Sequence, residues 1–224
     1  MHDVLNAFEN FEENALGLIP FGTGNDFAKS AKIPKNVEKA ARLIIGAPPK
    51  RIDFIEFESG LRSINSVGMG IDVDVLKRAY SGKNNKKSKY LHSLIISLAR
   101  FESYNFTVKY AGREEEHYGL IAAFGNGSYF GGGINMFPEA SIADGVLNLV
   151  IVDYISKFAT IGAFIKLMLG KVNKVKQVTA VAAEQVEFVP HCENYTIQAD
   201  GELYENHPFK AGIVKDKLSF HTAI

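Results

Sequence analysis

The most informative group of polar side chains in the sequence lies in the turn Phe21-Gly-Thr-Gly-Asn-Asp26, which follows a short apolar run. Gly22 and the glycine two residues on permit positive φ angles and close approach to the backbone. Thr23, Asn25 and Asp26 add a hydroxyl, an amide and a carboxylate. Together they predict a polar cradle at a helix start, where phosphate groups bind well. By glycine spacing alone, an ordinary strand-to-helix turn capped by Asn25 or Asp26 fits equally well.

A second group is the tripeptide Asp200-Gly-Glu202, which follows the alternating pattern of residues 195–199. Its two carboxylates would lie at a strand end with a glycine bend between them. One carboxylate can accept a proton while the other tunes it, and a positioned base contributes roughly 10²–10⁴-fold to a rate. Taken alone, the tripeptide is more typical of an Asp-Gly turn between two strands.

A third group lies in Ser141-Ile-Ala-Asp-Gly-Val146, where two oxygen-bearing side chains and a nearby carbonyl could converge on one point. Hard cations such as Mg²⁺ prefer oxygen ligands of this kind. The alternative is a simple turn before the strand expected over residues 146–152. The six histidines show no metal-type pairing, since none lies three to five residues from another.

The elements around the glycine turn follow the order strand, turn, helix. Residues 16–20 predict a short buried strand, and residues 27–31 and 37–45 predict helices. Gly46, Pro48 and Pro49 then end the helical pattern, so we predict a domain boundary there. Residues 1–15 carry apolar residues three to four apart from the outset, as in a helix.

After residue 50 the pattern changes to short runs with β-branched and aromatic residues at alternate positions, which predicts a β-sandwich. Residues 89–101 and 155–169 interrupt these runs, and their apolar spacing predicts amphipathic helices packed on the sheets. The expected strands cover residues 52–58, 62–67, 105–110, 118–124, 146–152, 185–188, 195–199 and 213–220.

Composition excludes several classes of protein. The 224 residues suit one domain plus part of another, at roughly 100 to 200 residues per domain. Lys plus Arg and Asp plus Glu both number 25, so no basic field favours nucleic acid. The longest apolar run, residues 158–169, is about half a membrane span. The single cysteine, Cys192, and the absence of a leader pattern are typical of a cytoplasmic protein.

Five blocks, in this order, resemble the soluble diacylglycerol kinase and sphingosine kinase group. They are Pro20-Phe-Gly-Thr-Gly-Asn-Asp-Phe-Ala28, Asn65-Ser-Val-Gly-Met-Gly-Ile-Asp72, Asn126-Gly followed by Gly131-Gly-Gly133, Pro138-Glu-Ala-Ser-Ile-Ala-Asp-Gly-Val-Leu147, and Asp200-Gly-Glu202. The resemblance covers essentially the whole chain. It implies an α/β plus β fold, with part of a nucleotide-binding domain at residues 1–47 and a β-sandwich lipid kinase domain at 48–224.

The resemblance also implies an activity, namely transfer of the γ-phosphoryl group of ATP to a lipid hydroxyl, most simply of diacylglycerol to give phosphatidic acid. Asp200 and Glu202 would then be the general-base pair, and Gly22, Thr23, Asn25 and Asp26 would face the nucleotide. A structural Mg²⁺ would be held by the Asp144 carboxylate and by the carbonyl oxygens of Ser141 and Val146.

The partners expected from these features are a lipid substrate and a membrane surface, with no nucleic acid and with a homodimer left open. The basic residues that could meet anionic headgroups are Lys77, Arg78, Lys83, Lys86, Lys87 and Lys89. A solvated loop is the alternative for this tract.

In the same family a strand ending in Gly-Gly-Asp-Gly-Thr precedes a helix, and Met1-His-Asp-Val-Leu-Asn6 resembles that helix from its first residue. Asp3 stands where the family usually has Glu. We therefore expect an N-terminally truncated chain, or an internal methionine taken as the start, with severely weakened ATP affinity. A non-catalytic lipid-binding remnant and a kinase acting on NAD remain as alternatives.

Overall fold

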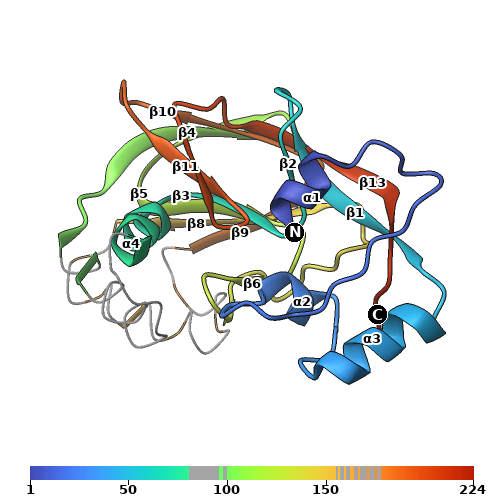
Figure 1. Ribbon diagram of the computed structural model, residues 1–224. Coiled ribbons are helices and arrows are strands. Elements are labelled where there is room, and N and C mark those ends of the chain that lie inside the picture. The colour runs from blue at the N-terminus through green and yellow to red at the C-terminus, as the bar shows by residue number, and fades with distance from the viewer. Residues whose placement is uncertain are drawn as a thin grey trace.

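The computed structural model describes residues 1–80, 96–97, 100–154, 156, 159, 162–163, 166, 171, 175 and 178–224. Most of the regular secondary structure in this part of the chain is β-strand, curled over the helices in Figure 1. The helices are α1 (His2–Asn6), α2 (Asp26–Ser30), α3 (Val37–Gly46) and α4 (Ile71–Tyr80). The strands are β1 (Lys50–Phe57), β2 (Arg62–Ser63), β3 (Ser66–Gly70), β4 (Tyr104–Tyr110), β5 (Arg113–Gly125), β6 (Tyr129–Phe130), β7 (Ile134–Asn135), β8 (Leu147–Asp153), β9 (Val178–Ala183), β10 (Gln185–Pro190), β11 (Thr196–Ala199), β12 (Glu202–Glu205) and β13 (Lys210–Phe220).

The strands form one large sheet with antiparallel pairing, in the order β12-β11-β3-β5-β4-β10-β13-β1-β2. Strand β8 pairs with β5 and carries β9, while β6 and β7 form a separate hairpin. Ile55 of β1 and Ile197 of β11 belong to the same buried cluster although their strands lie far apart in this order. The sheet must therefore curl to bring them together, as in the predicted β-sandwich-rich fold.

A second buried cluster joins the N-terminal residues to the sheet. Leu5 and Phe27 pack in it with Phe54 of β1 and Phe220 of β13. Phe27 meets Phe220 edge to face, with ring centroids 5.2 Å apart. The segments on either side of the predicted boundary at residues 46–49 thus share one hydrophobic core, and the division into two domains stays a prediction.

Several predicted elements differ from the structure near the N-terminus. Of the helix expected in residues 1–15, only the short α1 forms, and residues 16–20 form no strand of their own. Instead, Leu16 makes a single parallel bridge with Phe220. The expected run of residues 62–67 is split into β2 and β3 by a turn at residues 64–65. That turn is required because its backbone amides bind a buried carboxylate.

Other predicted elements were missed or cannot be compared. Strands β9 and β12 were not predicted, because β9 consists largely of small residues and β12 carries charge at both ends. The predicted helices at residues 89–101 and 155–169 fall mostly outside the described residues. Within the part of the chain that is described, no helix is both long and apolar enough to cross a bilayer.

We predict that Phe54→Ala destabilises the protein by about 3–5 kcal/mol, because Phe54 is 2% exposed and its removal leaves a cavity where the N-terminal segment meets the sheet. The matched control is Phe21→Ala, since Phe21 is 81% exposed. Urea unfolding should separate the two variants clearly. Equal midpoints would show that the shared cluster does not hold the segment in place.

Candidate active site

The carboxylate of Asp200 is the most heavily hydrogen-bonded acceptor of the predicted site. Its side chain is 8% exposed and lies at the tight turn between β11 and β12, with a left-handed φ of 53°. Ser63 Oγ donates to Oδ1 at 2.8 Å. The carboxylate also accepts three backbone N–H groups at 2.8–3.2 Å, those of Ile64, Asn65 and Ser66. The turn between β2 and β3 therefore wraps around this carboxylate.

The fifth group on Asp200 is His2, which comes from helix α1. His2 Nδ1 lies 3.2 Å from Asp200 Oδ2, and His2 Nε2 lies 2.6 Å from the Tyr204 hydroxyl. Burial would raise the pKa of Asp200, but the hydrogen bonds from His2 and Ile64, together with the histidine charge, bring it below the ordinary value. Asp200 is thus an ionised anchor.

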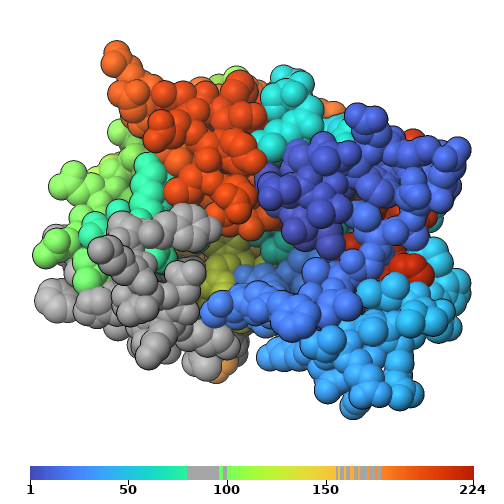
Figure 2. Space-filling view, in the orientation of Figure 1, coloured from blue at the N-terminus to red at the C-terminus, as the bar shows by residue number. Residues whose placement is uncertain are grey.

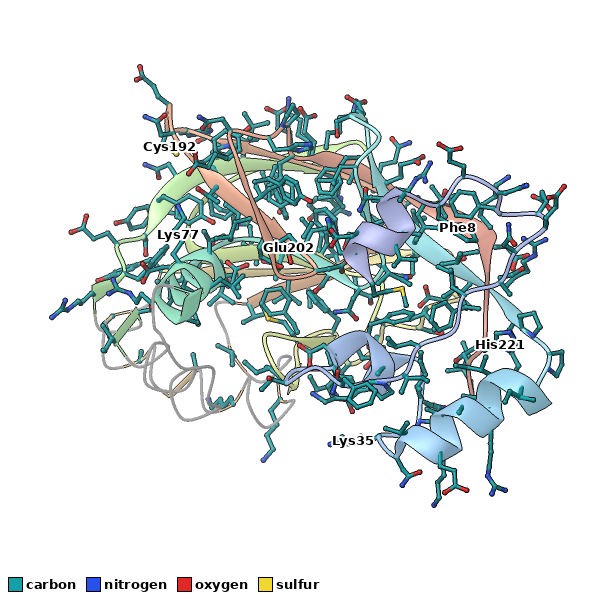
Figure 3. All side chains as sticks on the ribbon, viewed as in Figure 1. Phe8, Lys35, Lys77, Cys192, Glu202 and His221 are labelled. Atoms are coloured by element: carbon teal, nitrogen blue, oxygen red, sulfur yellow. The ribbon has the colours of Figure 1, made fainter. Side chains whose placement is uncertain are left out.

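Glu202 has a different environment from Asp200. It begins β12, and its side chain is exposed, whereas Asp200 is enclosed. In Figure 3 Glu202 lies beside helix α1, near the middle of the molecule. The space-filling view shows the N-terminal residues in dark blue packed against the orange-red residues of this hairpin (Figure 2). Of the predicted pair, Glu202 is the carboxylate that a substrate can reach.

Asn65 connects the Asp200 end of the site to the glycine turn. Its N–H binds Asp200, while its Oδ1 lies 3.4 Å from Ser30 Oγ on α2. Its Nδ2 donates to the Tyr129 carbonyl at 2.8 Å. A Cβ at Gly127 would lie only 2.2 Å from Asn65 Oδ1, so only glycine fits there. The Asn65 carbonyl accepts the N–H groups of Asn126 and Gly127, so Asn65, in the second sequence block, contacts the third and fifth blocks directly.

The predicted nucleotide turn is held to a second glycine turn by Asp26. Its Oδ2 accepts the Gly132 N–H at 2.7 Å, and its Oδ1 accepts from Lys29 Nζ at 2.9 Å. Asn25 takes the N-cap position with a left-handed φ of 53°. Its side chain does not cap the helix, because the amide donates to the Gly22 carbonyl instead.

Thr23 is the most exposed of the three polar residues in the same turn. Its side chain is exposed, and α2, which follows, has only five residues. The hydroxyl of Thr23 is thus available to a ligand, whereas the side chains of Asn25 and Asp26 shape the turn.

The predicted metal loop contains a carboxylate that already organises its own backbone. Asp144 accepts the N–H groups of Ser141 at 3.1 Å and Val146 at 3.2 Å. Desolvation, together with the negative charge of Asp53, raises the pKa of Asp144 above its ordinary value. Two carboxylates facing one loop favour a bound cation.

Asp53 was not predicted as a site residue, yet it connects the metal loop to the rest of the network. It is 3% exposed and accepts the N–H groups of Gly145 and Asp216, both at 2.7 Å. Its backbone carbonyl accepts from Asn126 Nδ2 at 2.9 Å. The available signal was an aspartate within the otherwise apolar run at residues 52–55.

The residues that would hold Mg²⁺ have suitable chemistry. Among the described residues no group of three or more His, Cys, Asp and Glu side chains forms a metal site. The predicted site needs only one carboxylate, that of Asp144, with the carbonyl oxygens of Ser141 and Val146. An all-oxygen set beside a second, buried carboxylate fits a hard divalent cation.

Asp72 is a buried carboxyl in the second sequence block. It is the second residue of α4 and is 5% exposed, and neither oxygen has a hydrogen-bond partner. The nearby Gln198 Nε2 is also unpaired. Burial raises the pKa of Asp72 to about 7, only partly offset by nearby amide donors. This side chain changes charge near neutral pH.

Comparison with known proteins agrees with this fold. Residues 65–221 match the model of the YegS C-terminal NAD kinase beta sandwich-like domain. Residues 1–57 match that of the diacylglycerol kinase catalytic domain. The fold and the site thus define a NAD kinase-like β-sandwich preceded by catalytic-domain sequence.

Curated relatives cover most of the chain. A "Probable lipid kinase YegS-like" of Xanthomonas campestris pv. campestris is 30% identical over 238 residues, covering 100% of this chain and 76% of the relative. A diacylglycerol kinase of Mycobacterium tuberculosis strain H37Rv is 28% identical over 195 residues, which cover 84% of this chain but 62% of the relative. The chain thus spans less than two thirds of that relative.

The fold is also seen in solved structures. A crystal structure of a diacylglycerol kinase from Bacillus anthracis str. Sterne aligns with a TM-score of 0.68 at 22% identity, over 93% of this chain and 66% of that one. Another Bacillus anthracis structure aligns with a TM-score of 0.78 at 23% identity, over 99% and 72%. The two family-model matches and the Xanthomonas relative show that the chain belongs to the diacylglycerol kinase and YegS family of lipid kinases.

We predict that Asp200→Asn destabilises the protein by about 3–5 kcal/mol, because an amide nitrogen would face backbone donors that need an acceptor. Glu202→Gln, an equally small change on an exposed side chain two residues away, should change stability by less than about 0.5 kcal/mol. Guanidinium unfolding at pH 7 compares them. A stable Asp200→Asn variant would refute the anchoring role of Asp200.

The raised pKa of Asp72 predicts a pH-dependent stability. Because the folded pKa of about 7 lies above the ordinary value of 3.8, the protonated form is favoured by folding. The unfolding free energy should then fall by about 2–3 kcal/mol between pH 5 and 7, at about 1.4 kcal/mol per unit. Asp72→Asn, which mimics the neutral carboxyl, should flatten this slope and be more stable than the wild type at pH 8. The same unfolding free energy at pH 5 and pH 8 in both proteins, measured by urea, would count against the raised pKa of Asp72.

Proposed function

We propose that the protein takes part in transfer of the γ-phosphoryl group of ATP to a lipid hydroxyl, most simply that of diacylglycerol. The observation that carries the proposal is the path of polar contacts from Asp26 in the glycine turn, through Ser30 and Asn65, to Asp200. The single Ser30 hydroxyl proton is shared between the Asp26 carbonyl at 3.1 Å and Asn65 Oδ1 at 3.4 Å. This path joins a turn suited to phosphates with a pair of carboxylates suited to proton transfer. Phosphoryl transfer needs both in one site, because catalysis rests on positioning and charge stabilisation.

The glycine turn would contribute to the nucleotide side. The exposed Thr23 hydroxyl can donate to a phosphate or to the nucleotide, while Asn25 fixes the turn through the Gly22 carbonyl. Asp26 holds the turn against Gly132, so both glycine turns would face the nucleotide as one unit.

The predicted general-base pair divides into two roles. Asp200 is saturated with donors, so it fixes the β2–β3 turn and helix α1 relative to β12. Glu202 is exposed and can accept the proton of the lipid hydroxyl as its oxygen attacks phosphorus. Because a diacylglycerol stays in the bilayer, this chemistry would occur at a membrane surface.

A magnesium ion held by Asp144 and by the carbonyls of Ser141 and Val146 would supply positive charge beside Asp53. Asp53 would in turn fix the position of Asn126, whose Nδ2 donates to the carbonyls of Asp53 and Ile64. The loop would thereby be tied to the turn that surrounds Asp200.

The proposal predicts that radiolabelled ATP and a lipid panel in mixed micelles give labelled phosphatidic acid from diacylglycerol. The assay should include NAD as an alternative acceptor. Glu202→Gln should lower the rate by about 10²–10⁴-fold, since it removes the proton acceptor. Glu205→Gln, at the other end of the same strand and also exposed, is the matched control and should retain activity. Labelling of NAD alone, or of no acceptor, would refute the lipid kinase proposal.

A further inference from the structure

His2 lies between an anion that can only accept and a hydroxyl that can do either. Asp200 is ionised and already surrounded by donors, so the facing His2 Nδ1 must carry a proton. In the neutral imidazole the other nitrogen, Nε2, is then an acceptor. Tyr204, 2.6 Å from Nε2, must donate its proton to His2.

Tyr204 shares a strand face with Glu202. The two residues are two apart on β12, and side chains at that spacing point to the same side of a strand. Burial raises the pKa of Tyr204, and so do the charges of Glu202, Asp3 and Asp200, in that order. Tyr204 therefore keeps its proton, which must be donated either to His2 or to another acceptor such as Glu202.

We propose that His2 is a positioning residue that holds the Tyr204 proton away from Glu202, and that protonation of His2 turns this proton toward Glu202. The inference rests on the proposed role of Glu202 as proton acceptor. With neutral His2, the Tyr204 proton is donated to His2, and Glu202 stays available to the lipid hydroxyl.

Protonation at Nε2 reverses the hydrogen bond. His2 then donates to the Tyr204 oxygen. The hydroxyl proton of Tyr204 stays on its oxygen but no longer points at His2, so it can be donated in a hydrogen bond to the Glu202 carboxylate. A carboxylate that accepts such a bond is a weaker base, because the bond stabilises its ionised form. The site would therefore lose activity as a falling pH protonates His2.

The charged and titratable groups around His2 come from each element packed against it. Helix α1 contributes Asp3, and the β11–β12 hairpin contributes Asp200, Glu202 and Tyr204. Strand β2 contributes Arg62, whose guanidinium is paired with Glu56. His207 packs edge to face on Tyr204, with ring centroids 5.7 Å apart. Among these groups the carboxylates outnumber the cations.

The first test is the pH dependence of kcat/KM with short-chain diacylglycerol for the full chain and its Tyr204→Phe variant. Removal of the hydroxyl removes the proton that blocks Glu202, so the acid limb should move down by about one to two pH units, toward the range of a carboxyl. The ratio of activity at pH 6 to that at pH 8 should rise. Tyr195→Phe is the matched control, because its hydroxyl donates to the His207 carbonyl, and it should keep the wild-type limb. An unchanged limb in Tyr204→Phe would overturn the proposal.

The second test needs no kinase activity. In protein with ¹³C-labelled glutamate carboxyls, the Glu202 signal, assigned with Glu202→Gln, should show an inflection at the pH where the His2 imidazole titrates. Tyr204→Phe should abolish this inflection. Its absence in the wild type would overturn the proposal whatever the activity. An inflection in a protein that labels no lipid would support the contact and refute the kinase function instead.

Discussion

The structure depends on the buried charge of Asp200. An ionised carboxylate taken out of water is costly unless donors replace the water, and here five groups do so. Three of them are consecutive backbone amides, which forces residues 64–66 into a turn around the carboxylate. The same charge holds His2 and thereby α1. One side chain thus fixes the turn between β2 and β3, the β11–β12 hairpin and the N-terminal helix.

Beyond that turn, the loops of the site are connected by hydrogen bonds of backbone and side-chain amide groups rather than by ion pairs. Asn65 reaches α2 and Tyr129, and Asn126 reaches the carbonyls of Asp53 and Ile64. Such contacts require close approach of main chains, which explains the glycine at 127, where a Cβ would overlap Asn65. Because the hydrogen bonds of the Asn65 and Asn126 amide groups to main-chain carbonyls are 2.8–2.9 Å long and directional, a shift at one turn would displace the next. The glycine turn, the metal loop and the carboxylate pair therefore form one unit.

The sequence predicts the larger elements of this arrangement well, because alternation in strands such as β4 and β13 reflects burial on one face. It misses β9 and β12, whose side chains are small or charged and whose strand state depends on pairing with β8 and β11. The five blocks supply the predicted site residues, but not the contacts that distinguish them. His2 and Asp53 act through partners distant in sequence, 198 residues for His2 and Asp200, and no local pattern carries such a pairing.

The contrast between Asp200 and Glu202 shows how a single glycine can separate two roles. Asp200 has a left-handed backbone at the turn, which directs its side chain inward onto the amides of residues 64–66. Gly201, with a φ of 97°, completes the reversal, and Glu202 begins the next strand with its side chain exposed. One carboxylate is thereby kept ionised by donors and removed from proton exchange, while its neighbour stays open to protons. Pairs of acids whose environments differ in this way can divide structural and chemical work within three residues. The length of the turn is then constrained: an inserted residue that shifted β12 by one position against β11 would turn Glu202 and Tyr204 together to the opposite face, away from His2.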